Sequence, residues 1–132
     1  MTDKIAFDLV SPERLLLSEN AEMITLPGAE GYLGVLAGHE PLITVLRAGV
    51  IDVKGGDKGD ARFFVLSGFA EVNPGKLTVL AEEAIPMEHI DAAALDKRIA
   101  NAREDILTAK TDADRAKAVI VVDDLETLRA AI

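Results

Sequence analysis

The chain has 132 residues, almost half of them apolar, and a formal net charge of −9, which favours one domain, or one small domain with an appendage. This charge argues against a nucleic-acid partner and against direct binding to an anionic membrane, because phosphates would repel the chain. No apolar run approaches the roughly 18–20 residues that span a bilayer, no signal peptide is recognisable, and no cysteine is present, so we expect a soluble chain without membrane insertion, disulfides or a thiolate metal site.

Alternating apolar and polar residues predict short β-strands up to about residue 83, because successive side chains of a strand point to opposite faces. The runs with this alternation cover residues 5–9, 24–26, 33–35, 42–46, 51–53, 63–65, 70–72 and 77–79. Glycine, proline, asparagine and aspartate separate the runs, most clearly at residues 55–60, where we expect a solvated turn. Eight to ten short strands at this spacing favour an antiparallel sandwich or a flattened barrel.

Residues 28–44 are the most distinctive of the segments between strands. Four glycines fall within eleven residues, and Gly38-His39-Glu40-Pro41 closes the group. Glycine allows the backbone to turn sharply or to approach another surface closely. Because shaped loops on a rigid strand scaffold often carry contacts, this segment is the first candidate contact surface.

The period changes from about Met87, where apolar residues recur every three or four positions and so form one face of a helix. These positions are Leu95, Ile99, Ala102 and Ile106 in one segment, and Val121, Leu125, Leu128 and Ile132 in the next. Thr111 or Asp112 is expected to cap the second helix, and the short connection predicts an antiparallel two-helix hairpin. The β-branched run 119–122 favours a strand by itself, but the helical period continues beyond it, so we favour helix.

No motif typical of an enzyme is present in the chain. It lacks a phosphate-binding loop, a nucleophile elbow, a zinc-binding helix motif and an EF-hand loop. His39 and His89 have no acid–nucleophile pattern around them, and we interpret Asp123-Asp124 as a solvated helix face. The residues alone therefore indicate a binding or regulatory protein, with no catalytic residue, no metal site and no cofactor, rather than an enzyme.

Three blocks of sequence resemble one known family. The first is residues 7–14, Phe-Asp-Leu-Val-Ser-Pro-Glu-Arg; the second is the glycine-rich block 26–42; the third is residues 68–82, beginning Gly-Phe-Ala-Glu-Val. In order and spacing they are similar to the epsilon subunits of rotary ATP synthases, over residues 5 to about 85. The resemblance implies a sandwich domain of about ten strands at 1–85 and an antiparallel two-helix hairpin domain at 86–132.

The resemblance also implies a function. It implies a rotor position in the central stalk, bound to the gamma subunit and the c-ring, at the cytoplasmic face of the bacterial inner membrane. There the chain would couple proton-driven ring rotation to ATP synthesis in the catalytic head without performing chemistry itself. In the family the glycine-rich loops approach the ring, so Glu30, Gly31, Tyr32 and His39 are the candidate ring contacts. Tyr32 stands where some relatives have an acidic residue, which implies a different kind of contact.

Some members of the family bind ATP through a motif at the start of the first helix. The matching positions here are Ile90 and Asp91, but Ala94 stands where the motif has arginine. An alanine cannot neutralise a phosphate as an arginine does. Arg98 and Arg103 are the candidate substitutes for that arginine, and we expect weak or absent ATP binding.

In some relatives the hairpin extends into the alpha and beta subunits of the catalytic head and inhibits ATP hydrolysis through basic residues. Here acidic residues outnumber the basic ones on the second helix, so we expect weak inhibition. An alternative from another class is a free-standing β-sandwich that binds a small ligand beneath a helical lid. A third alternative, an enzyme of unrecognised type, would need a concave cluster of titratable residues.

Overall fold

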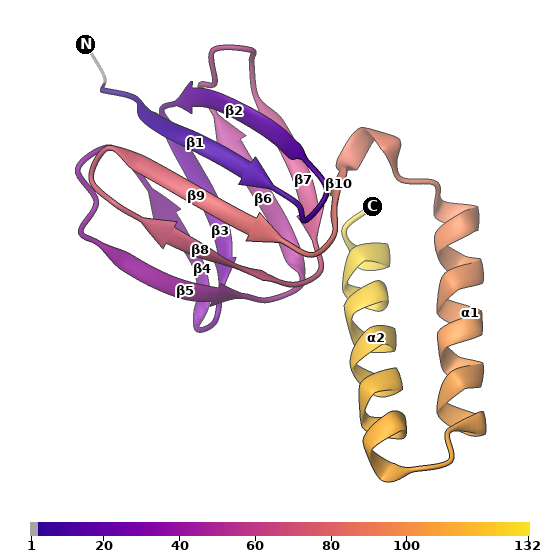
Figure 1. Ribbon diagram of the computed structural model, residues 1–132. Coiled ribbons are helices and arrows are strands. Elements are labelled where there is room, and N and C mark those ends of the chain that lie inside the picture. The colour runs from indigo at the N-terminus through magenta and orange to yellow at the C-terminus, as the bar shows by residue number, and fades with distance from the viewer. Residues whose placement is uncertain (1–2) are drawn as a thin grey trace. The chain divides into compact units, whose positions relative to one another are not determined.

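A computed structural model describes residues 3–132 as ten strands followed by helices (Figure 1). The elements are β1 (Ile5–Val10), β2 (Leu15–Ala21), β3 (Met23–Gly28), β4 (Gly31–Val35), β5 (Leu42–Leu46), β6 (Gly49–Lys54), β7 (Ala61–Val65), β8 (Gly68–Val72), β9 (Lys76–Ala81), β10 (Ala84–Pro86), the 3-10 helix η1 (Met87–His89), α1 (Ala92–Thr108) and α2 (Asp112–Ala130). The predicted fold class, a mainly β sandwich followed by a two-helix hairpin, is confirmed.

The chain divides into a strand unit that ends at Met87 and a helical unit, Glu88–Ile132. The predicted domains, a β-sandwich at 1–85 and a helical hairpin at 86–132, stay a prediction. None of the helices in the described residues is both long enough and apolar enough to cross a membrane.

The strands form one hydrogen-bonded sheet that folds on itself into two layers. Its order is β10-β7-β6-β3-β5-β8-β9-β1-β2, with β4 paired to β3. Figure 1 shows β5, β8, β9 and β1 in one layer and β3, β6 and β7 in the other. The layers join where β3 meets β5, at the pair Gly28 and Leu46. Within residues 3–132 the strand pairs are antiparallel, as predicted, except β1 and β9, which run parallel.

Apolar residues at every second position of the strands point into the space between the two layers and fill it. In β1, Ile5, Phe7 and Leu9 are fully buried, and burying each such side chain contributes about 1.5–3 kcal/mol. Sequence patterns did not predict β2 or β10. The first begins with three leucines and continues with polar residues, so it shows no clean alternation, and the second has only three residues.

The turn at residues 55–60 joins β6 to β7 and is fastened to the edge strand β2. The Asp57 N–H donates to the Asn20 carbonyl at 3.0 Å, and the Lys58 N–H donates to the Glu19 carboxylate at 3.1 Å. Lys4 adds an ion pair with Asp57 at 2.8 Å. The predicted solvated turn is present, since Asp57 and Lys58 are exposed. Beyond the prediction, the turn also forms hydrogen bonds to β2.

A side chain caps the N-terminus of each α-helix. The Asp91 carboxylate accepts hydrogen bonds from two N–H groups of the first turn of α1, at 2.9 and 3.3 Å. The Thr111 hydroxyl accepts from the Asp114 N–H at 3.1 Å. Thr111 is therefore the cap of α2, and Asp112 is its first helical residue. The run 119–122 lies inside α2 and is helical, as predicted.

The two helices run antiparallel and bury an apolar stripe between them (Figure 1). Its buried residues are Leu95, Ile99, Ala102, Val122, Leu125 and Leu128. The prediction was wrong for Val121 and Ile132, which are exposed. Val122 is buried in place of Val121, so the buried residues of α2 recur every three positions, a spacing that also keeps side chains on one helix face.

Ion pairs connect the helices beside this stripe. The Arg129 Nε donates to the Asp96 carboxylate at 2.8 Å, and Arg103 pairs with Glu126.

Burial, together with the negative charge of Asp123, raises the pKa of Asp124. Asp123 is exposed and Asp124 is half-buried, so the acidic pair is only partly the solvated face that was predicted.

Candidate docking surfaces

Apolar side chains form a row across the outer face of one sheet layer. Strand register places Val45 beside Phe69, Phe69 beside Leu80, Leu80 beside Val10, and Val10 beside Leu15. Four of these side chains are exposed, from 65% for Val45 to 39% for Leu80, and Val10 is half-buried. We call these five residues the apolar row. Exposed apolar groups that are contiguous in this way mark interaction sites.

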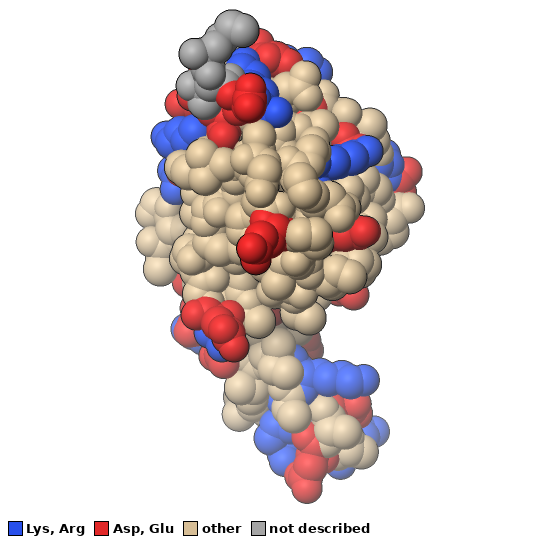
Figure 2. All heavy atoms as spheres, turned by 90° about the vertical axis from the view of Figure 1, so that its left-hand side faces the viewer, with Lys and Arg blue, Asp and Glu red and all other residues tan. Residues whose placement is uncertain are grey.

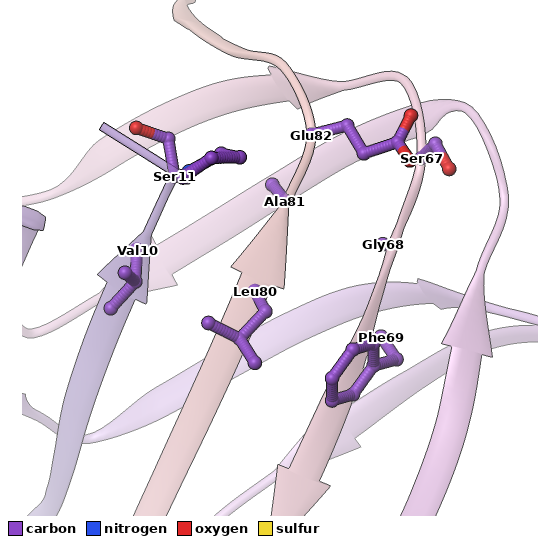
Figure 3. Close-up of a pocket in the computed structure, with 9 residues that line it drawn as sticks. Val10, Ser11, Ser67, Gly68, Phe69, Leu80, Ala81 and Glu82 are labelled. Carbon is purple, nitrogen blue, oxygen red and sulfur yellow. The ribbon is translucent and has the colours of Figure 1, made fainter. Parts of the chain in front are cut away.

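A hollow of about 340 Å³ lies at the row (Figure 3). Val10, Leu80 and Phe69 project from three adjacent strands, and Ser11 and Glu82 lie at the strand ends beside them. The hollow therefore combines an apolar floor with hydroxyl and carboxylate groups at one end. On the side of the strand unit that Figure 2 shows, the centre is mostly uncharged apart from isolated acidic groups, and Lys and Arg side chains lie toward the margins.

Gly68 lines the hollow, and no sequence pattern marked it as a site residue. A Cβ at this position would lie 2.1 Å from the carbonyl oxygen of Leu80, far inside van der Waals contact. Only glycine therefore lets β8 and β9 pair this closely. The available signal was a glycine at the start of a strand run, which often marks a close approach of two backbones.

Three of the predicted ring contacts, Glu30, Gly31 and Tyr32, lie together on the β3–β4 hairpin. Gly28 pairs with Gly31, so the turn consists of Ala29 and Glu30, both exposed. Gly31 has a φ of +131°, which residues with a side chain rarely adopt. A hollow of about 460 Å³ lies between this turn and the first residues of β5.

His39, the fourth predicted contact, lies on the separate loop between β4 and β5. Its ring Nδ1 is 2.7 Å from the carbonyl oxygen of Glu40. The same loop is joined to the β8–β9 turn by the Gly38 N–H, which donates to the Pro74 carbonyl at 2.7 Å. The structure thus groups three of the predicted residues on one turn and places His39 on its own loop.

The candidate nucleotide positions take part in the architecture of the hairpin. Asp91 caps α1 and Arg103 pairs with Glu126. Arg98 is exposed on α1 and Ile90 is half-buried just before it. Over residues 3–132, no group of three or more histidine, aspartate or glutamate side chains is arranged to hold a metal ion.

The fold and these surfaces define a class of protein: a small acidic β-sandwich with a helical hairpin and exposed contact surfaces. Residues 4–87 match the family model described as ATP synthase, Delta/Epsilon chain, beta-sandwich domain. The chain is 48% identical, over 129 residues and 98% of both chains, to the ATP synthase epsilon chain of Parvibaculum lavamentivorans. It is 44% identical to that of Mesorhizobium japonicum, over 100% of this chain and 98% of the relative. The chain belongs to the ATP synthase delta/epsilon family.

Solved structures agree with this assignment. A chain in the cryo-EM structure of the Euglena gracilis mitochondrial ATP synthase, titled OSCP/F1/c-ring, matches with a TM-score of 0.81 and 32% identity, over 97% of this chain and 81% of that one. A chain of the Tetrahymena thermophila mitochondrial ATP synthase, titled central stalk/cring, matches with a TM-score of 0.68 over 98% of this chain and 97% of that one. At 14% identity the second match supports the fold alone.

Proposed function

We propose that this chain is the epsilon subunit of a rotary ATP synthase, a rotor component of the central stalk that couples c-ring rotation to ATP synthesis in the catalytic head. Its relatives named ATP synthase epsilon chain align over both the strand unit and the hairpin. The Euglena assembly that contains its structural neighbour includes F1 and a c-ring. In this role the chain transmits rotation and performs no chemistry of its own.

The apolar row is the observation that carries the proposal, and we assign it to the gamma subunit. The row crosses five neighbouring strands, and strands lie about 4.8 Å apart, so it is about 19 Å long. That length equals about three and a half turns of an α-helix. A partner helix with one apolar stripe therefore matches the row, and burial of apolar area supplies the binding energy without any need for charge attraction.

We assign the second contact, to the c-ring, to the β3–β4 turn. Glu30 and Tyr32 are exposed there, and Gly31 gives the turn its shape. His39 adds a contact from its separate loop. The net charge of −9 disfavours direct adhesion to an anionic lipid surface. The chain is therefore held by its partner subunits, as a peripheral component at the cytoplasmic face of the bacterial inner membrane.

Co-purification with tagged gamma subunit and c-ring tests these assignments. We expect the wild-type chain to co-purify with both, and Phe69→Glu to weaken gamma binding at least tenfold, because it places a charge in the middle of the apolar row. The matched control is Leu107→Glu, which changes an apolar residue that is 85% exposed on α1. A wild-type chain that elutes alone as a monomer would overturn the stalk assignment and favour the free-standing ligand-binding sandwich.

ATP binding by the hairpin is expected to be weak or absent. Ala94 replaces the arginine of the family motif, Asp91 serves as a helix cap, and Arg103 already has a carboxylate partner. Isothermal titration of the full chain with ATP is expected to give no measurable heat at sub-millimolar concentrations. A saturable curve with sub-millimolar affinity would contradict the prediction.

A further inference from the structure

The two layers of the sandwich meet at a corner where the strand ladder is interrupted. The ladder between β3 and β6 ends at the pair Thr25 and Asp52, and β3 touches β5 only near Gly28. Pro27 lies between these points and has no N–H to donate, and its carbonyl accepts from the Arg47 N–H at 2.9 Å. The first residues of β6 therefore lie beyond the regular ladder.

The side chain of Tyr32, which is 60% exposed, bridges this interruption. Tyr32 is the cross-strand partner of Pro27, and its phenol oxygen accepts a hydrogen bond from the Val50 N–H at 3.1 Å. A Cβ at Gly49 would lie 2.6 Å from that phenol oxygen and 2.8 Å from the Cβ of Pro27. Only glycine at position 49 leaves room for the tyrosine to lie across the proline and reach β6.

The β3 side of the β3–β4 hairpin is held in the sheet by β6 and β5, and the Tyr32 contact adds a connection from β4, its second strand. Strand β4 pairs with β3 alone, so its other edge has no neighbouring strand among the described residues. The turn residues Ala29 and Glu30 are exposed, and Gly31, at φ +131°, belongs to the residue type with the most backbone freedom. Near the turn, the Tyr32 hydroxyl therefore connects β4 to β6 in addition to its pairing with β3.

We propose that Tyr32 is a positioning residue: its phenol fastens the β3–β4 hairpin to the start of β6 and so fixes the direction in which Glu30 projects. This role rests on the proposed function, in which that turn meets the c-ring. Tyr32 therefore acts mainly through the orientation of the turn, and the exposed face of its ring remains available to the partner.

Tyr32→Phe tests the proposal because it removes the oxygen and keeps the ring. In the full-length chain we expect hydrogen exchange at the Val50 amide to accelerate at least tenfold, and the NMR order parameters of Ala29 and Glu30 to fall, while the amides of β8 and β9 keep their exchange rates. The matched control is Ser18→Ala, which removes a hydroxyl that donates to Asp8 and is expected to leave Val50 unchanged.

Reassembled ATP synthase in membrane vesicles supplies the functional measurement. With Tyr32→Phe we expect proton pumping per ATP hydrolysed to fall at least twofold, while the amount of bound subunit stays constant. Unchanged exchange at Val50 overturns the hydrogen-bonded connection, and unchanged pumping overturns the positioning role. Failure of the wild-type chain to assemble overturns the proposed function instead, so the two failures are distinguishable.

Discussion

At the scale of single residues, Asp8 connects three strands through one carboxylate. On β1, it accepts a hydrogen bond from the Ser18 hydroxyl of β2 at 2.7 Å and lies 3.0 Å from the Lys76 ammonium of β9. The hydrogen bond from Ser18, and then the hydrogen bond and charge of Lys76, hold the pKa of Asp8 below its ordinary value. Ionised Asp8 therefore stabilises the folded state at pH values above its ordinary pKa of about 3.9. This stabilisation is lost as the pH falls through the lowered pKa of the folded state.

Asp8→Asn is expected to lower the free energy of unfolding at pH 7 by about 1 kcal/mol, the usual net worth of such a hydrogen bond. Because the side-chain amide that replaces the carboxylate does not titrate, the difference in the free energy of unfolding between variant and wild type shrinks below about pH 4. Urea unfolding at a series of pH values measures both effects. The exposed carboxylate variant Glu13→Gln serves as the control, and a constant difference across that pH range would contradict the assignment.

Gly68 and Gly75 give a matched pair of tests for close backbone packing. Gly68→Ala brings a Cβ within 2.1 Å of the Leu80 carbonyl oxygen, whereas nothing lies within 4 Å of a Cβ at Gly75. Overpacking of this kind costs about 1–3 kcal/mol, so we expect a clear loss of stability for Gly68→Ala. Gly75→Ala is expected to stay close to wild type in the same urea titration, and equal stability of the two variants would refute the argument.

Sequence patterns predicted buried residues better than they predicted exposed apolar ones. The apolar run of β5 identified a strand, but Leu42, Val45 and Leu46 look alike in the sequence, although only Leu46 is buried. The apolar row emerges only from the register of five strands that are distant in sequence. The candidate ring contacts depended on family resemblance, and the phenol contact of Tyr32 depended on a fold corner that no local pattern contains.

At the scale of elements, the Asp91 side chain caps the N-terminus of α1. Asp91→Ala is expected to destabilise the first turn by about 1 kcal/mol, whereas Asp91→Asn keeps an equally good cap. Hydrogen exchange at the amides of Ala93 and Ala94, which donate to Asp91, measures the effect in the full chain. Equal acceleration in both variants would show that the negative charge, and not the capping geometry, matters.

The elements were predictable where a regular period repeats and less so at the edges. The helical period continued past the β-branched run 119–122 and gave α2 correctly. On its inner face Leu125 and Leu128 are buried as predicted, whereas Val122 is buried in place of Val121. β2 shows no clean alternation in its sequence, and of its seven residues only Ala21 is buried.

At the scale of the whole molecule, the sandwich core lies entirely within the strand unit. Truncation after residue 86 is therefore expected to leave a folded sandwich that still binds gamma. Because acidic residues outnumber basic ones on α2, loss of the hairpin is expected to raise ATP hydrolysis of the reassembled enzyme less than about twofold, in keeping with poor charge complementarity to an acidic partner.

ATP hydrolysis by complexes carrying the full-length or truncated chain measures this effect. The control is equal occupancy of the two chains in the complex, checked by gel densitometry. A severalfold rise in hydrolysis on truncation would show that the hairpin is a strong inhibitor despite its acidity.

The turn at residues 55–60 has a consequence for how copies of this chain behave in solution. β2 ends the order of strands, and a terminal strand offers unpaired main-chain groups that can recruit a strand from another molecule and so start aggregation. At the end of β2 near Asn20, the Asn20 carbonyl already accepts a hydrogen bond from the Asp57 N–H. The charged residues Lys4, Asp57 and Lys58 lie beside this end of the strand. A subunit made before its partners are available is thereby protected, at that end of the edge, from strand-to-strand association with its own copies.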